Sequence, residues 1–155
     1  MNNSNSNDLI KIEEDAIKIQ EQDLRDTITS IDNETTKSSL VIGFAGILFG
    51  IAFGQIDNFP LFHTIIFISL LLASIAFAFW NIISKKITIH TSVDDIFVNK
   101  RPQEWEEYLN YRHLHLRETY NSAKNLLYQK VTFTKISFCL LILSSLFLVL
   151  IKIGG

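Results

Sequence analysis

Cysteine and proline are scarce in this chain of 155 residues. The single cysteine, Cys139, excludes an intramolecular disulfide and a CxxC metal site. The only prolines are Pro60 and Pro102, and no glycine or proline occurs between Asp8 and Lys37. Because these two residue types interrupt helices most often, the sequence permits long uninterrupted helices.

Motifs for catalysis and for metal or nucleotide binding are also missing. The sequence contains no GxGxxG, Walker loop, HExxH or GxSxG. His113 and His115 are two residues apart, which places them on opposite faces of a helix. We therefore expect no enzymatic activity, no metal and no cofactor. The net charge of −2 provides no basic field, so nucleic acid is not an expected partner.

Charged side chains are missing from long apolar stretches. Residues 38–56 and 60–84 contain no Asp, Glu, Lys or Arg, and residues 136–151 lie between Lys135 and Lys152. A helix needs about 20 apolar residues to cross a hydrocarbon core of about 30 Å. The third stretch reaches that length if residues 131–134 are added and Lys135 extends toward the interface. The sequence therefore predicts three membrane-spanning helices.

Lysine and arginine are distributed unevenly among the remaining segments. The first 37 residues carry four and residues 85–135 carry nine, whereas the connection QIDNF carries none and the tail carries one. Lysine and arginine stay on the cytoplasmic side of a membrane. We therefore expect a multi-pass membrane protein with a cytoplasmic N-terminus and an outward-facing C-terminus.

Apolar residues recur at helical spacing in both cytoplasmic segments. Residues 1–7 are polar and of low complexity, and we expect them to be disordered. Within residues 8–37, apolar residues recur every seven positions opposite an acidic face, at Ile10, Ile17, Leu24 and Ile31. After Pro102 a second stripe leads into the third apolar stretch without a breaker: Trp105, Leu109, Leu116, Tyr120, Ala123 and Leu127.

These patterns predict an all-α integral membrane protein with three transmembrane helices. Two long cytoplasmic helices would be continuous with the first and third spans. The expected order is a cytoplasmic helix (8–37), a two-span hairpin (38–84), a cytoplasmic linker and helix (85–135), and a last span with a short outer tail (136–155). The two cytoplasmic helices, one acidic and one basic, would pack in parallel. In the linker, ITIHTSV alternates weakly, which leaves a short strand as the alternative to an extended segment.

Glycines recur in the first apolar stretch, GFAGILFGIAFG. Gly46, Gly50 and Gly54 are four residues apart and share one helix face. In lipid, small residues permit the close backbone approach that drives helix association. Ser69 and Ala73 offer a matching face in the second stretch. The glycine face therefore packs either within the chain or against another copy, which would make a homo-oligomer.

One cytoplasmic stretch, NKRPQEWEEYLNYRHLHLRETY, combines basic and aromatic side chains. Such a combination suits an anionic nucleotide, anionic lipid headgroups or packing between the cytoplasmic helices. The candidate ligand-binding residues are Arg101, Trp105, Tyr108, Arg112 and Arg117. The sequence leaves these three interpretations open.

The order of the features resembles a family of bacterial membrane effectors. The amphipathic helix ends in IDNETTKSSLVIGFAGILFG, two spans follow, and EWEEYL and ETYNSAKNLLYQKVTFTKI precede the last span. This layout is similar to the small transmembrane effectors of nucleotide-signalled antiphage defence, the Pycsar-type and SLATT-type proteins. The resemblance implies oligomerisation and membrane disruption after a nucleotide signal from a partner cyclase, but carries over no binding residue. The alternative is a scaffold or accessory subunit that docks a cytoplasmic protein.

Overall fold

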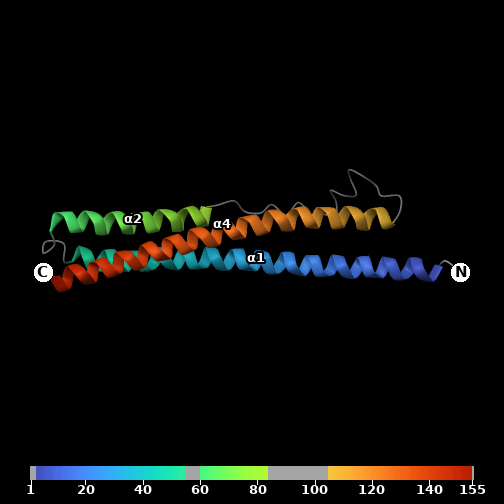
Figure 1. Cartoon of the computed structure of the whole chain (residues 1–155), viewed down its shortest axis with the longest axis horizontal. Helices are drawn as coiled ribbons and strands as arrows, with labels where there is room; N and C mark the ends of the chain where they lie inside the picture. The colour runs from blue at the N-terminus through green and yellow to red at the C-terminus, as the bar shows by residue number, and fades with distance from the viewer. Residues whose placement is uncertain (1–2, 55–59, 84–104, 155) are drawn as a thin grey trace. The chain divides into compact units, whose positions relative to one another are not determined.

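A computed structural model of the chain describes residues 3–54, 60–83 and 105–154. Its helices are α1 (Asn3–Phe53), α2 (Leu61–Ile83) and α4 (Trp105–Gly154), and these ranges contain no strand (Figure 1). Each helix is long and apolar enough to span a membrane. For the described residues, the prediction of an all-helical chain with three candidate spans is therefore confirmed.

Several predicted boundaries differ from the structure or lie outside it. Helix α1 begins at Asn3 and so includes most of the segment that we expected to be disordered. The described part of α4 begins at Trp105. The QIDNF connection, the ITIHTSV segment and Pro102 lie outside the described residues.

Helix α1 passes from polar to apolar sequence without a break. The polar part is rich in Ser and Thr, whose hydroxyls compete for backbone hydrogen bonds. Here the hydroxyls donate to the carbonyl oxygen four residues earlier, at 2.8–3.2 Å. The residues concerned are Thr27, Thr29, Ser30, Thr35, Thr36 and Ser39. Because these hydroxyls are satisfied within the helix, the stretch remains helical.

The contacts divide the chain into two compact units, and both α1 and α4 contribute to each. Unit 1 comprises residues 1–30 and 86–126, and unit 2 comprises residues 31–85 and 127–155. In unit 1 the buried side chains are apolar or aromatic, and most belong to the predicted stripes. They are Ile17, Leu24, Tyr108, Leu109, Leu116 and Ala123.

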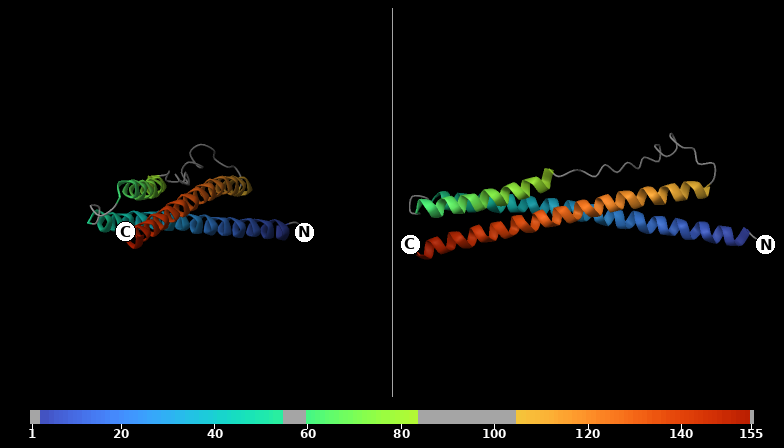
Figure 2. Two further views of the ribbon diagram at one scale, coloured as in Figure 1. Left: turned by 60° about the vertical axis from the view of Figure 1, so that its left-hand side comes forward. Right: turned by 45° about the horizontal axis from the view of Figure 1, so that its top comes forward.

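In unit 2, α2 packs antiparallel to the neighbouring part of α4. Ser74 Oγ donates to the carbonyl oxygen of Ser137 at 2.8 Å. Asn81 lies later on α2, yet it contacts Thr134, which lies earlier on α4. Both views in Figure 2 show α2 beside α1 as well, and buried apolar residues of all three helices form one core in this unit.

Buried positions on α1 and α4 recur every seven residues. On α1 they are Ile17, Leu24, Ile31, Ser38, Ala45 and Ala52. On α4 they are Leu109, Leu116, Ala123, Lys130, Ser137 and Ser144. This repeat is typical of helices packed as a coiled coil. In unit 2, the contacts of Thr35 with Lys130 and of Ser38 with Thr134 show that the two helices run in parallel.

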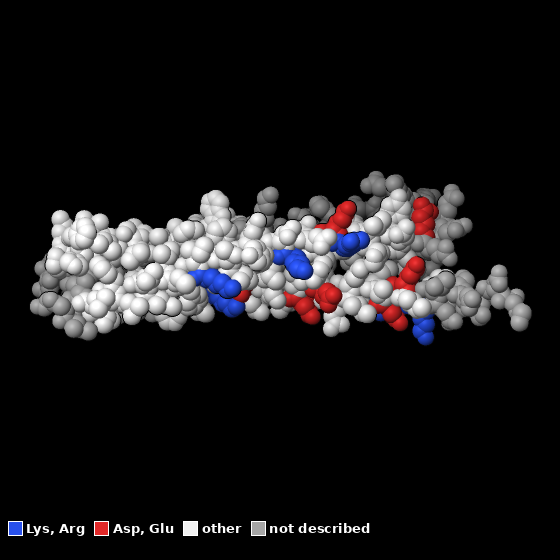
Figure 3. All heavy atoms as spheres, in the orientation of Figure 1, with Lys and Arg blue, Asp and Glu red and all other residues white. Residues whose placement is uncertain are grey.

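The three apolar segments carry large apolar side chains on their outer surface. Examples are Phe44, Phe49, Leu72, Phe79 and Leu146, which are all exposed. On the face drawn in Figure 3, no Lys, Arg, Asp or Glu covers these segments. Exposed apolar surface of this extent marks a contact with a membrane or a protein. It agrees with the expectation that lipid surrounds unit 2.

Candidate functional site

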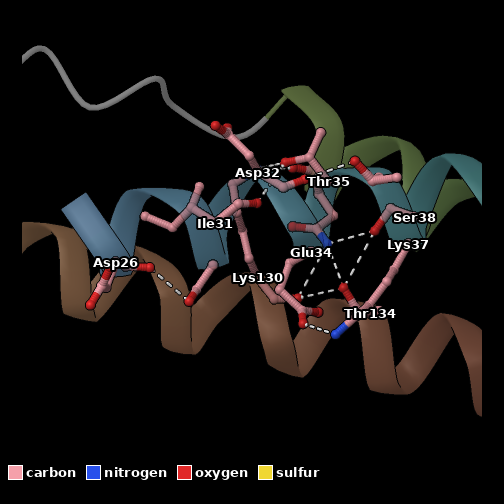
Figure 4. A network of polar contacts seen from close by, with 12 residues as sticks. Asp26, Ile31, Asp32, Glu34, Thr35, Lys37, Ser38, Lys130 and Thr134 are labelled. Atoms are coloured by element: carbon pink, nitrogen blue, oxygen red, sulfur yellow. Dashed lines mark hydrogen bonds and ion pairs between the residues drawn. The ribbon is translucent and has the colours of Figure 1, made fainter. Parts of the chain in front are cut away.

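A cluster of polar side chains is buried where the three helices of unit 2 meet (Figure 4). Asn81 of α2 lies at its centre and is 0% exposed. Its amide nitrogen donates to Ser38 Oγ at 2.7 Å and to Thr134 Oγ1 at 2.8 Å. The same nitrogen lies 3.2 Å from the carbonyl oxygen of Lys130. One amide group thus connects α1, α2 and α4.

Lys130 of α4 binds the end of α2. Its Nζ donates to the carbonyl oxygen of Asn81 at 2.5 Å and to Thr35 Oγ1 at 3.2 Å. Since α2 ends at Ile83, the carbonyl of Asn81 is one of the last four, which have no partner within the helix. A lysine in this position caps the helix and complements the negative end of its dipole.

The surroundings of Lys130 make it an unusual residue. It is only 3% exposed, and its ammonium group forms no ion pair with any described residue. The carboxylate that acts on Lys130 through its charge is that of Asp32, with which it forms no ion pair, and the buried Glu34 is paired with Lys37 at 2.5 Å. Burying a charge is costly unless it is well hydrogen-bonded. A buried ion at the edge of a candidate membrane span is therefore a candidate functional group.

The hydrogen bonds of the cluster hold the three helices of unit 2 against one another. Thr134 and Ser137 donate their hydroxyl protons to carbonyl oxygens of α4 itself. Within the described ranges, no group of His, Cys, Asp or Glu could hold a metal ion. The sequence analysis did not single out this cluster. The signal was present, because Lys130 lies seven residues after Ala123 and so continues the buried repeat.

The glycine face of α1 is turned away from the other helices of unit 2. A Cβ atom added at Gly46 or Gly50 would meet no atom within 4 Å, and at Gly54 only backbone oxygens of α1 itself. Ser69 is exposed and Ala73 is half-buried. Packing of the glycines against α2 or α4 within the chain, one of the two predicted alternatives, is therefore not observed among the described residues.

The position of the seven-residue repeat explains why the glycines face away from the core. The repeat places Ala45 and Ala52 against α2 and α4, where both are buried. Gly46 follows Ala45 by one residue and Gly50 precedes Ala52 by two, so both glycines are rotated away from the core. The small residues that pack inside the unit are therefore alanines and serines, and the glycines remain on the surface.

Two of the candidate ligand-binding residues, Tyr108 and Arg112, take part in contacts within the chain. Arg112 of α4 forms an ion pair with Glu21 of α1, and its second terminal nitrogen lies 3.4 Å from Tyr108 Oη. Burial tends to lower the pKa of the Arg112 guanidinium, but the hydrogen bond and charge of Glu21 outweigh it, with Tyr108 adding to them. The pKa is thus raised above its usual value. Of the three interpretations of this stretch, the contact corresponds to packing between the two helices that we expect in the cytoplasm.

The remaining candidates do not join Tyr108 and Arg112 in one site. Arg117 is exposed and has no ion-pair partner among the described residues. Arg101 and the side chain of Trp105 lie outside what the structure describes. The structure thus offers no assembled cluster of cations and aromatic rings for an anionic ligand within its described ranges.

A groove of about 480 Å³ lies between α1 and α4 in unit 1. Its walls include Ile12, Glu13, Ala16 and Ile17 on α1 and Leu109 and His113 on α4. The carboxylate of Glu13 opposes the binding of a nucleotide phosphate here, because like charges repel. Comparisons with protein-family models, with curated proteins and with solved structures found no match to this chain.

Proposed function

We propose that the protein is a membrane-embedded, non-catalytic, homo-oligomeric effector that permeabilises the bacterial inner membrane on a cytoplasmic signal. The glycine face of α1 is the observation that carries this proposal. It lies among exposed Phe and Ile side chains and has no partner among the residues that the structure describes. In lipid, such a face is useful only to another membrane helix, which it allows to come close. A second copy is the simplest source of that helix.

The continuity of α1 and α4 supports a response to a cytoplasmic event. Each helix contributes residues to unit 1 and to unit 2 without interruption. A packed helix moves as a whole element when its neighbours rearrange. A signal received by unit 1 therefore has a direct mechanical connection to the segments that we expect in the membrane.

The resemblance to antiphage effectors suggests the biological context. It implies that the signal comes from a nucleotide cyclase, either through the nucleotide itself or through a cytoplasmic protein partner. The proposed topology keeps the N-terminus and unit 1 in the cytoplasm, where such a signal is made. The C-terminus would lie outside.

Gly50→Leu tests the oligomer. Since a Cβ at position 50 meets nothing within 4 Å, the leucine fits the folded chain without a clash. We expect this variant to lose self-association, measured by the mass of the protein in detergent micelles. Ile51→Phe, which adds volume at an exposed neighbouring position, is the control and should leave the mass unchanged. An unchanged oligomer in Gly50→Leu would contradict a role for the glycine face.

Membrane potential tests the activity. Cells that produce the wild-type chain should depolarise when phage infection or a partner cyclase supplies the signal, and cells that produce Gly50→Leu should not. A voltage-sensitive dye measures both. If the potential persists under every trigger while a different protein co-purifies with the chain, the protein is an accessory subunit and the proposed function is wrong.

A further inference from the structure

Unit 1 leaves apolar side chains exposed beside its groove. Ile12, which lines the groove, is 64% exposed, and Ile19 is 62% exposed. The two are seven residues apart and therefore lie on the same side of α1 in a coiled coil. Unlike the outer side chains of unit 2, they belong to the segment that we expect in water. Exposed isoleucines at coiled-coil spacing indicate a further helix partner.

The two edges of the groove carry opposite charges. Asp23 follows the groove residue Ala16 by seven positions on α1, and Arg117 follows the groove residue Asn110 by seven on α4. Asp23 and Arg117 are both exposed, and neither forms an ion pair with a described residue. On the opposite side of the same helix pair, Glu21 and Arg112 do form one. The charges of Asp23 and Arg117 on the groove side can therefore pair with charges of a binding partner.

We propose that this groove binds the same groove of a second copy, so that unit 1 forms a four-helix bundle across a twofold axis. The inference rests on the proposed homo-oligomer and adds a second contact region to it. Insertion in one membrane makes all copies parallel, so the axis lies along the helices. Such an axis places the α1 edge of one copy opposite the α4 edge of the other. Asp23 then faces the second copy's Arg117, which is a complementary contact on both sides.

Site-specific cross-linking tests this arrangement. Two differently tagged chains, both with Cys139→Ser, carry Ala16→Cys on the α1 edge or Asn110→Cys on the α4 edge. A short bismaleimide should join position 16 of one chain to position 110 of the other at least about tenfold more than two positions 16 to each other. Equal yields would overturn the proposal.

Charge reversal makes the test specific. Asp23→Arg in the Ala16→Cys chain should reduce the mixed cross-link by about tenfold, because it faces Arg117 of the other copy. Arg117→Glu in the Asn110→Cys chain should then restore the yield, since both contacts become complementary. Glu14→Arg is the matched control, because Glu14 precedes Glu21 by seven residues and lies on the opposite side. A reduction by Glu14→Arg, or no restoration by the pair, would overturn the groove contact.

The result can be separated from the proposed function. If the mixed cross-link forms as expected but cells never depolarise, the groove contact stands and the effector activity is wrong. If a different protein is joined to position 16 in place of the second copy, the groove belongs to a partner and the inference fails. Helicity of every variant, measured by circular dichroism, should match the wild type because none of the altered side chains is buried.

Discussion

Leu116 and Ser137 occupy equivalent positions of α4, three heptads apart, and both are buried, at 5% and 0% exposure. Leu116 belongs to unit 1 and Ser137 to unit 2. The difference is general, since every buried polar or charged residue of the described chain lies in unit 2. They are Glu34, Ser38, Ser74, Asn81, Lys130, Thr134, Ser137 and Ser144. The two units thus share one spacing, but among the described residues only unit 2 buries polar side chains in addition to apolar ones.

The proposed insertion of unit 2 into lipid would account for this difference. In water, apolar side chains are driven together because burial removes them from the solvent. In lipid that force is absent, and helices associate through small residues and hydrogen bonds between side chains. The purely apolar core of unit 1 and the serine, asparagine and alanine side chains buried beside the apolar core of unit 2 agree with the proposed passage of the chain from cytoplasm to bilayer. A soluble protein would gain nothing from exchanging leucine for serine midway along a helix.

The largest loss of stability is expected when a serine, which is typical of the buried positions of unit 2, replaces a buried leucine of unit 1. Leu116→Ser should destabilise unit 1 by about 3 kcal/mol, because it removes buried apolar volume and buries a hydroxyl. Amide hydrogen exchange of the α1 and α4 segments in nanodiscs would measure this. Leu114→Ser, at a site two residues earlier that is exposed, should change stability by less than about 0.5 kcal/mol. Equal effects of the two substitutions would contradict the assigned core.

A somewhat smaller loss of stability is expected when a large side chain replaces a small buried one in unit 2. Ala45 is fully buried between helices, so Ala45→Leu should cost about 2 kcal/mol through overpacking. Unfolding by SDS in a detergent that keeps the chain monomeric would measure it. Gly46→Leu, one residue later, should leave the monomer as stable as wild type, because its Cβ meets nothing. If Gly46→Leu were the more damaging change, the glycines would face the core.

Removing the central amide of unit 2 should have a moderate effect. Asn81→Ala deletes the hydrogen bonds to Ser38 and Thr134 and should cost about 1 kcal/mol, as expected for bonds between helices in lipid. The same SDS titration applies. Asn33→Ala, on the exposed surface of α1, should have no measurable effect. A neutral Asn81→Ala would show that the polar cluster does not hold the helices together.

The smallest effect is expected for the ion pair of unit 1. Arg112→Gln should cost about 0.5 kcal/mol, since both partners are partly exposed and solvent screens their attraction. The loss should shrink as salt is added. Hydrogen exchange at low and high ionic strength would measure both. An effect that does not depend on salt would mean that packing of the Arg112 side chain, rather than its charge, stabilises the contact.

The helices and candidate spans could be predicted from the sequence because their causes are local. Charge-free stretches and the scarcity of proline are visible without a structure, and so is the repeat of Ile17 and Leu24 in the water-exposed part. The direction of the glycine face could not be predicted in the same way. Every face of a span is apolar, so hydropathy does not distinguish the core side from the lipid side. Only the continuation of the repeat from Ile31 to Ser38 and Ala45 carries that information.

The polar cluster depends on contacts between distant parts of the chain. Lys130 is buried because the carbonyl of Asn81, 49 residues earlier, ends a helix next to it. A lysine between polar residues and an apolar stretch is usually assigned to the surface, and hydropathy alone supports that assignment. The ligand-binding hypothesis met a similar difficulty. The basic and aromatic residues around Arg112 are those of a nucleotide site, but the Arg112 side chain forms an ion pair with Glu21 of the neighbouring helix.

The unbroken course of α1 also limits how the gene can change in length. One inserted codon before Ile31 would turn all later residues of the helix by about 100°, and Ala45 would leave the core. Seven inserted codons would add about two turns and restore the original angle. Natural variants of this protein should therefore differ in the length of their cytoplasmic helices by multiples of seven residues, in α1 and α4 together.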